Sequence, residues 1–351
     1  MGELEKKINK FLQYAEKKHG KNTVMKLSDA SFTSFPSVST GALNLDLALG
    51  IGGIPLGRVT EIYGHEGSGK TTLALHIGAE AMKKGLPVLY IDTENALDPN
   101  YAKAIGMDID SEGFMLSQPD DAETALQLVE DFSTIVGEGV VIIDSVAAMV
   151  TRQELQGDIG DSTIAVLARL MSQSLRRLTK ILADRNTALV FLNQVREKVG
   201  VMYGNPEVTP GGRALKFYSS VRMEVRRKES VKEGKDVIGH EARVKIVKNK
   251  LYPPYKEATI RILYGKGIDT LHSLIETALE TGVITRAGSY YSFGNERLAQ
   301  GKESLRKVIE SEPELKEKIK QAVISKVKSI EGGNESEPDK KEKKEGKSKK
   351  K

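Results

Sequence analysis

Three apolar runs in the middle of the chain each end on a polar residue, and helical patterns separate them. The runs are Val88–Asp92, Val140–Asp144 and Ala188–Asn193, and the helical patterns cover Thr71–Lys84, Ala122–Ile135 and Ser162–Ala183. Apolar strands that alternate with helices are typical of an α/β fold, with a mostly parallel, twisted sheet covered by helices on both faces. Ligands bind such sheets where the carboxyl ends of the strands meet. The residues predicted on that edge are Asp92, Asp144, Asn193 and Gln194.

A glycine-rich segment joins a predicted strand, Arg58–Tyr63, to the first of these helices. Gly64–Thr71 fits the pattern G-x-x-x-x-G-K-[ST], in which the backbone N–H groups and the helix N-terminus surround a polyphosphate. Lys70 would reach the β- and γ-phosphates, and Thr71 would ligate Mg²⁺. An ordinary glycine-rich turn is the alternative, but the strand–loop–helix context favours a phosphate-loop NTPase that binds ATP or a close relative. The predicted binding residues are Gly64, His65, Glu66, Gly67, Ser68, Gly69, Lys70, Thr71 and Thr72.

Acidic residues after two of the strands are candidates for metal binding and catalysis. Asp144 would hold Mg²⁺ directly or through water, although a strand-end Asp can also cap a helix. Glu94 would orient or deprotonate the attacking water, and Asp92 competes with it for this role. Spacing alone leaves the choice between Glu94 and Asp92 open.

The chain has four predicted parts. They are an N-terminal arm at 1–33, a core at 34–269, a small α+β domain at 270–330 and a disordered tail at 331–351. The arm combines an amphipathic helix over residues 3–19 with a short extended piece, Thr23–Leu27. It is too small to bury its own apolar face, so it packs either on the core or on another subunit. Residues 195–212 are rich in Gly and Pro and predict a long flexible loop, and a hairpin-like break is expected at Tyr290–Gly294.

Composition narrows the class of protein. The net charge is +5, but residues 340–351 alone contribute +6, so the rest of the chain is nearly neutral and its charge does not indicate nucleic-acid binding. The chain contains no cysteine, which excludes disulfides and thiolate zinc sites. The polar start and the lack of a run of ~20 apolar residues predict a cytoplasmic protein with no membrane segment.

Several longer motifs resemble those of the bacterial RecA recombinase family. They are Tyr90–Pro99, Val141–Ala148, Gly160–Ser162, Met171–Gln173, Asn193–Arg196, Gly200–Pro206, Thr209–Phe217 and Val247–Lys250. The similarity runs in order from about Leu4 to Val327. It implies an ATP-dependent DNA recombinase with DNA-stimulated ATPase activity, which forms helical filaments on single-stranded DNA, pairs it with homologous duplex and promotes strand exchange. It also implies roles in recombinational repair and in stimulating self-cleavage of a damage-response repressor.

The resemblance assigns roles around the nucleotide. Glu94 would activate water, and Gln194 would sense the γ-phosphate. Tyr101 and Tyr264 would pack on the adenine, and Asp98 would hydrogen-bond it. A neighbouring subunit would supply two further cations to the γ-phosphate, Lys248 and Lys250.

The same resemblance assigns DNA binding to two loops and the helix between them. The implied residues are Gly157, Ile164, Arg169, Arg176, Arg196, Lys198, Gly200, Met202, Tyr203, Gly211 and Gly212. From spacing alone, Arg169 and Arg176 share a helical face that would equally suit plain solvation.

Two other classes of protein carry a phosphate loop. A small-molecule kinase would need an Arg-rich lid, and a ring helicase or other motor would lack the N-terminal arm and the Gly200–Gly212 pattern.

The sequence departs from the family pattern at four positions and in the tail. His65 and Gly67 stand where the family usually has Pro and Ser, and Asn95 and Tyr203 replace a usual His and Phe. The family commonly ends in an acidic tail that restrains access to DNA, whereas this chain ends in a Lys-rich one.

The basic tail is expected to attract DNA or other anionic partners. Deleting 332–351 should weaken duplex binding at low salt, because Lys side chains near phosphates release counterions. Anisotropy titrations of a labelled duplex check this, and unchanged or tighter binding by the truncated chain would contradict it.

Overall fold

The computed structural model describes residues 2–20, 23–24, 35–158, 165–197 and 207–333. The chain divides into two compact units, Met1–Pro36 and Ser37–Lys351. The first unit holds helix α1 (Glu3–His19), as predicted, with Leu4 72% and Phe11 57% exposed along its apolar side. The predicted extended piece is not seen in the part described, since Thr23 and Val24 lie in a bend, and Met25–Leu27 fall outside the described residues.

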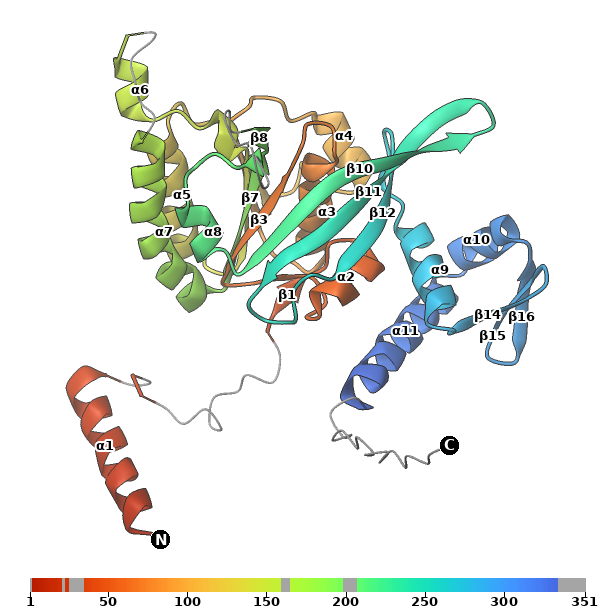
Figure 1. Cartoon of the computed structure of the whole chain (residues 1–351), viewed down its shortest axis with the longest axis horizontal. Helices are drawn as coiled ribbons and strands as arrows, with labels where there is room; N and C mark the ends of the chain where they lie inside the picture. The colour runs from red at the N-terminus through yellow and green to blue at the C-terminus, as the bar shows by residue number, and fades with distance from the viewer. Residues whose placement is uncertain (1, 21–22, 25–34, 159–164, 198–206, 334–351) are drawn as a thin grey trace, which may run out of the picture. The chain divides into compact units, whose positions relative to one another are not determined.

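The second unit is built on a nine-stranded sheet in the order β13-β12-β11-β10-β3-β7-β6-β4-β5 (Figure 1). The six strands from β10 to β5 are parallel, which confirms the predicted sheet. The other three extend it in antiparallel fashion, and β10 and β11 form a long ribbon. The strands are β3 (Val59–Gly64), β4 (Val88–Asp92), β5 (Phe114–Ser117), β6 (Gly139–Asp144), β7 (Thr187–Gln194), β10 (Val221–Glu233), β11 (Asp236–Asn249), β12 (Glu257–Leu263) and β13 (Gly267–Ile268). A separate two-stranded piece joins β1 (Ser37–Val38) to β2 (Ile54–Pro55).

Helices cover both faces of this sheet and enclose two apolar clusters. The first cluster lies under α2 (Leu43–Leu49), α3 (Lys70–Lys83) and α4 (Pro99–Ile105). The second lies under α5 (Ala122–Ile135), α7 (Val166–Arg185) and α8 (Ala214–Tyr218). Two clusters form because successive side chains of a strand point to opposite faces of the sheet. In β6, Val140 and Ile142 belong to the first cluster, and Val141 and Ile143 belong to the second.

Most predicted elements lie within a few residues of the observed ones. Helix α5 and strand β4 have the predicted bounds, and α3 is shifted by one residue. Helix α7 begins at Val166 and runs two residues beyond its predicted end at Ala183. It ends where Asn186 adopts a left-handed conformation (φ 55°), which Asn tolerates better than most residues. Between β6 and α7 lie a short 3-10 turn (Val146–Ala148) and α6 (Arg152–Gln156).

The long segment predicted as an irregular loop has a paired base. Strand β8 (Arg196–Glu197) pairs in antiparallel fashion with β9 (Glu207–Val208). The prediction that residues 195–212 contain no strand is therefore wrong for these two short stretches. The glycines and prolines that motivated it lie between or after these strands. Residues 198–206 lie outside the described part of the chain.

The C-terminal elements gather around a third apolar cluster. They are α9 (Thr270–Glu280), β14 (Ile284–Ala287), β15 (Tyr290–Phe293), β16 (Glu296–Gln300), α10 (Lys302–Ser311) and α11 (Pro313–Gly333). Their three strands form one antiparallel sheet, with Gly294 in the turn after β15. Leu43 of α2 joins this cluster, and Asn44 hydrogen-bonds Ser273 at 2.8 Å, which holds α9 against the core. Helix α11 continues to Gly333, three residues into the tail that was predicted to be disordered at 331–351, and residues 334–351 lie outside the described part.

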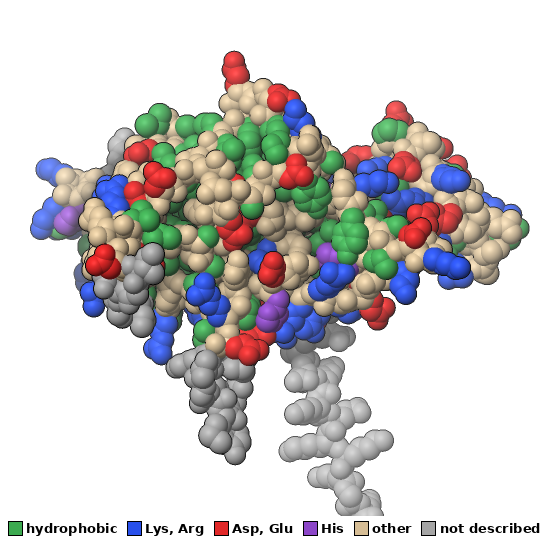
Figure 2. All heavy atoms as spheres, turned by 90° about the horizontal axis from the view of Figure 1, so that it is seen from above, with side chains coloured by type: hydrophobic (Ala, Val, Ile, Leu, Met, Phe, Trp, Pro, Cys, Tyr) green, Lys and Arg blue, Asp and Glu red, His purple; other side chains and the backbone are tan. Residues whose placement is uncertain are grey.

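The surface in Figure 2 carries Lys and Arg side chains interspersed with Asp and Glu. This mixture agrees with the near-neutral charge of the chain without its tail. None of the helices in the described ranges has the length and apolarity needed to cross a bilayer.

Candidate functional site

The glycine-rich loop lies between the end of β3 and the start of α3. Gly69 precedes the helix with φ 99°, a conformation that L side chains rarely adopt, so the turn favours glycine. The first turn of α3 contains no acidic residue, and its N-cap makes no side-chain hydrogen bond. The N–H groups at this end therefore suit a phosphate.

Two polar side chains of the loop point to the same ligand chemistry. Lys70 Nζ donates to the carbonyl oxygen of His65 at 2.8 Å. Burial lowers the pKa of Lys70, while the carboxylates of Asp144, Glu94 and Glu66 act in the opposite direction. Ser68 Oγ is buried and has no hydrogen-bond partner among the described residues. A phosphate bound in the loop would accept hydrogen bonds from both groups, so the residues fit ATP.

A carboxylate at the end of β6 contacts the last residue of the glycine-rich loop. Thr71 Oγ1 and the hydroxyl of Tyr90 both donate to Asp144 Oδ2 at 2.8 Å. Burial raises the pKa of Asp144, these two hydrogen bonds lower it, and Glu94 and Asp92 raise it further, so a nearby cation would favour the ionised form. Across the described ranges, no group of three or more His, Cys, Asp or Glu could hold a metal. The Thr71 hydroxyl and the Asp144 carboxylate offer two neighbouring oxygens, which fit Mg²⁺ because this ion takes one or two protein oxygens and completes its shell with phosphate and water.

The two candidate catalytic acids lie in different environments. Asp92 is 2% exposed, and its oxygens accept hydrogen bonds from the backbone of Ala96 and Leu97 and from Gln118. Asp92 therefore holds the turn after β4 and is poorly placed to reach water. Glu94 is exposed on that turn, which favours it as the residue that faces a water molecule.

Glu94 also connects the ends of two strands. Its Oε1 accepts hydrogen bonds from Ser145 Oγ and from Gln194 Nε2, the latter at 3.2 Å. Gln194 ends β7 and pairs with Gly64 across the sheet, so it lies at the start of the phosphate loop. The structure thus brings together three of the predicted elements: the loop, Glu94 and Gln194.

Of the predicted adenine-binding residues, Tyr101 contacts the first turn of α3. The Tyr101 hydroxyl and Thr72 Oγ1 share a hydrogen bond of 2.8 Å. Tyr264 is half-exposed, follows Ile262 by two residues, and accepts a hydrogen bond from Arg227. Asp98 caps α4 through Oδ1, which accepts from the backbone of Asn100 at 2.8 Å.

Lys248 and Lys250 lie together, but not at their own subunit's loop. Lys248 Nζ donates to the carbonyl oxygens of Lys216 and Phe217 at 2.6 and 3.0 Å, and Lys250 Nζ to that of Phe217 at 3.4 Å, so both meet the end of α8. Lys248 pairs with Arg222, which is level with Glu61. Lys248 is therefore two strands across the sheet from Glu61, and Glu61 is three residues before Gly64 along β3. These spacings put the Cα atoms of Lys248 and Gly64 roughly 14 Å apart. Burial lowers the pKa of Lys248 to about 8, helped by repulsion from Lys250 and Arg222.

Part of the predicted DNA-binding set lies on and beside α7. Arg169 and Arg176 are exposed on the side opposite the buried Met171 and Leu175. A Cβ on Gly212 would lie 2.8 Å from Ala168, next to Arg169, so the 207–212 segment meets the start of α7. Gly211, Gly157 at the end of α6 and Arg196 in β8 are also described. Five predicted residues lie outside the described residues: Ile164, Lys198, Gly200, Met202 and Tyr203.

Several contacting residues were missed by sequence reasoning. Ser145 follows Asp144 directly, so the sequence could have placed it at the binding edge of the sheet together with the other polar strand-end residues. Glu61 is fully buried and bonded to Arg222 and Asn193, and no pattern in the sequence marks this trio. The contact between His65 and Glu207 joins residues 142 apart in the chain, which no local pattern reveals.

Comparisons with known proteins extend the likeness beyond this site. Residues 6–269 match the RecA N-terminal domain and residues 272–328 the RecA C-terminal domain. Protein RecA of Aquifex aeolicus is 50% identical over 323 residues, which cover 92% of this chain and 93% of that protein. Protein RecA of Thermus aquaticus is 49% identical over 326 residues, covering 93% and 95%.

A crystal structure of the RadB recombinase matches the fold, with a TM-score of 0.50, 24% identity, and coverage of 66% of this chain and 98% of that one. This likeness concerns the fold alone. The two domain matches, together with half-identical relatives that are covered almost end to end, show that the chain belongs to the RecA family.

Proposed function

We propose that this protein is an ATP-dependent DNA recombinase of the RecA type. The contact between Gln194 and Glu94 carries the proposal. Glu94 stands beside Asp144 and the phosphate loop, and Gln194 lies two residues before β8, at one end of the predicted DNA-binding segment. One side chain thus joins the nucleotide site to the DNA site, as a nucleotide-controlled DNA-binding protein requires.

The nucleotide is proposed to bind in three parts. The phosphates would occupy the loop from Gly64 to Thr72, with Lys70 against the β- and γ-oxygens. Mg²⁺, when bound, would stabilise charge on those oxygens, and Thr71 and Asp144 would hold it. The adenine would lie between Tyr101 and Tyr264, near Asp98. The N-terminus of α3 and the buried Ser68 hydroxyl, which has no hydrogen-bond partner in the described part of the chain, support the placement of the phosphates.

Hydrolysis is proposed to rest on Glu94. Its carboxylate would orient a water molecule in line with the γ-phosphorus and accept its proton. Ser145 and Gln194 hydrogen-bond the same oxygen and would fix its direction. Lys70 would stabilise the negative charge on the transferring group. Loss of the γ-phosphate would release Gln194, and through it the segment that begins at β8.

DNA is proposed to bind along α7 and the segments on either side of it. Arg169, Arg176 and Arg196 would contact phosphates, which fixes the strand without reading its sequence. The other proposed contacts are Gly157, Ile164, Lys198, Gly200, Met202, Tyr203, Gly211 and Gly212. Homology would be tested by base pairing between the bound strand and a duplex.

Subunits are proposed to assemble head to tail into a helical filament. The Lys248–Lys250 pair would meet the γ-phosphate of a neighbour. Lys248 is crowded by other cations, and an incoming phosphate would relieve that repulsion. Phe217 beside the pair is 69% exposed, and the exposed apolar side of α1 offers a second contact. The domains proposed for these roles are 1–33 for docking, 34–269 for ATP and DNA, and 270–330 as the small C-terminal domain.

Removing both interface lysines should separate ATP binding from assembly. Lys248→Ala with Lys250→Ala is expected to leave ATP affinity of the isolated subunit within about twofold and to lower DNA-stimulated hydrolysis by about 10³-fold, the scale of a cation supplied in trans. Coupled ATPase assays and filament imaging check this. Full stimulation in the double variant would exclude the trans role.

One experiment tests the function as a whole. ATP hydrolysis is measured with and without single-stranded DNA, and the complexes are imaged. Strong stimulation together with helical filaments supports the recombinase. Hydrolysis indifferent to DNA but dependent on a small acceptor would identify a kinase, and closed rings would identify a motor.

The proposal extends to the cell. The protein would act in the cytoplasm in recombinational repair, and its filament would stimulate self-cleavage of a damage-response repressor. Incubating filaments with a purified repressor of this kind and following its cleavage tests the second role, and an intact repressor would count against it.

A further inference from the structure

The phosphate loop is tied to the predicted DNA-binding segment at a second place, away from Gln194. His65 Nε2 lies 3.1 Å from Glu207 Oε1. His65 is the second residue of the loop, and Glu207 begins β9. Because β9 pairs with β8, Gln194 holds one leg of this hairpin and His65 holds the other.

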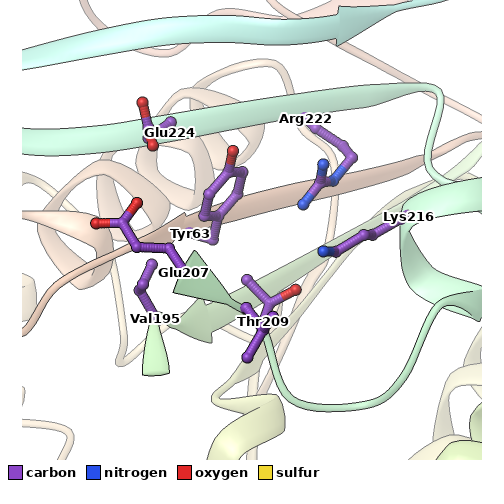
Figure 3. A pocket seen from close by; sticks show the side chains of 8 residues that line it. Tyr63, Val195, Glu207, Thr209, Lys216, Arg222 and Glu224 are labelled. Atoms are coloured by element: carbon purple, nitrogen blue, oxygen red, sulfur yellow. The ribbon is translucent and has the colours of Figure 1, made fainter. Parts of the chain in front are cut away.

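The contact is built into a small network. The second oxygen of Glu207 accepts a hydrogen bond from Arg226, which also donates to Glu224 at 2.8 Å. Both residues belong to β10, whose Val225 pairs with Gly64, the first residue of the loop. Burial opposes ionisation of Glu207, but the hydrogen bonds from Arg226 and His65 outweigh it and hold its pKa below the ordinary value. Figure 3 shows Glu207 and Glu224 at one end of a pocket, with Arg222 and Lys216 at the other. The volume of this pocket is about 160 Å³.

The same residue is linked to the loop lysine. Lys70 Nζ donates to the backbone oxygen of His65, while the imidazole of His65 meets Glu207. A bound phosphate would compete with the backbone oxygen of His65 for the Lys70 ammonium. Its arrival would therefore change the backbone contact of His65, while the imidazole of His65 remains in contact with Glu207 of β9. The family usually has Pro at this position, which has no side-chain donor.

We propose that His65 is a positioning residue that couples the phosphate loop to strand β9 through Glu207, as a second connection between nucleotide and DNA binding beside Gln194. This inference rests on the proposed function. The proposed role of the His65 side chain is separate from phosphate binding, because the backbone groups of the loop bind phosphate with any side chain at position 65.

The test measures coupling and not binding alone. The affinity for a fluorescein-labelled oligo-dT is determined by anisotropy at fixed salt, with and without a non-hydrolysable ATP analogue and Mg²⁺. The ratio of the two dissociation constants is the coupling factor. His65→Ala is expected to lower this factor about fivefold, near the lower end of usual couplings. Affinity for the analogue without DNA should stay within about twofold, which separates lost coupling from a damaged loop.

Two further variants and a control sharpen the result. His65→Gln keeps an N–H donor and should retain most of the coupling. In a double-mutant cycle, His65→Ala and Glu207→Ala together should lower the factor no more than the larger single effect. Lys83→Ala, in a pair of similar exposure (62% and 23%, against 52% and 17% for His65 and Glu207), should leave it unchanged.

The outcomes are distinct. Wild-type coupling in His65→Ala, or fully additive effects in the cycle, would overturn the inference and leave the recombinase function standing. A wild-type protein whose DNA affinity ignores the nucleotide would instead overturn the proposed function, and this inference with it.

Discussion

Replacing Lys70 with Ala is expected to abolish ATP-dependent DNA binding and strand exchange together. Lys70 supplies the loop's cation, and its pKa is lowered by burial yet supported by three nearby carboxylates. Losing one charge-stabilising donor costs about 10²–10³-fold in turnover, and losing a charge-assisted hydrogen bond weakens ATP binding by tenfold or more. ATPase assays, DNA anisotropy and strand-exchange gels measure the three effects.

A matched control is available on the same helix. Lys83 lies 13 residues further along α3, roughly 20 Å away, and pairs with Glu80 at 2.7 Å on the surface. Lys83→Ala should behave as wild type in all three assays. Full strand exchange by Lys70→Ala would refute the nucleotide-driven mechanism, whatever the control does.

Glu94→Gln is expected to separate binding from turnover. Glutamine keeps the size of the side chain and its Oε1, which can still accept from Ser145 and Gln194. It cannot take a proton from water, so hydrolysis should fall about 10²–10⁴-fold. ATP and DNA affinities should change little, and filaments assembled with ATP should last longer because the γ-phosphate is retained.

The measurement combines single-turnover hydrolysis with filament lifetime. Glu112→Gln is the matched control, since Glu112 is exposed just before β5, at the opposite end of the parallel strands from the phosphate loop. Hydrolysis at the wild-type rate in Glu94→Gln would clear this residue of the catalytic role. A loss of DNA binding with normal folding would show that Glu94 acts mainly through Gln194.

Local patterns in the sequence were enough for the parallel part of the sheet. The β4, β6 and β7 runs are continuous and apolar because both of their faces are buried. The glycine-rich loop was recognisable because its function fixes residue types at fixed spacing. The choice between Glu94 and Asp92 needed the structure, since two residues of separation decide which carboxylate is buried and which is exposed.

What could not be predicted depends on contacts between distant segments. Strands β8 and β9 are two residues each, too short for a periodic signal, and their pairing is supported by Glu207 bonding to His65 and Arg226. Lys248 lies beside Arg222 because β11 runs antiparallel to β10, and no local sequence pattern predicts this pairing. In both cases the sheet brings together residues whose separate surroundings look ordinary.

The position of Gln194 has a thermodynamic consequence. It ends β7, contacts Glu94 and leads within two residues into β8. If ATP strengthens DNA binding by some factor through this residue, linkage requires DNA to strengthen ATP binding by the same factor. A subunit on DNA would then keep its ATP at concentrations at which a free subunit has already released it, so the length of available single strand would itself set how much nucleotide the protein holds.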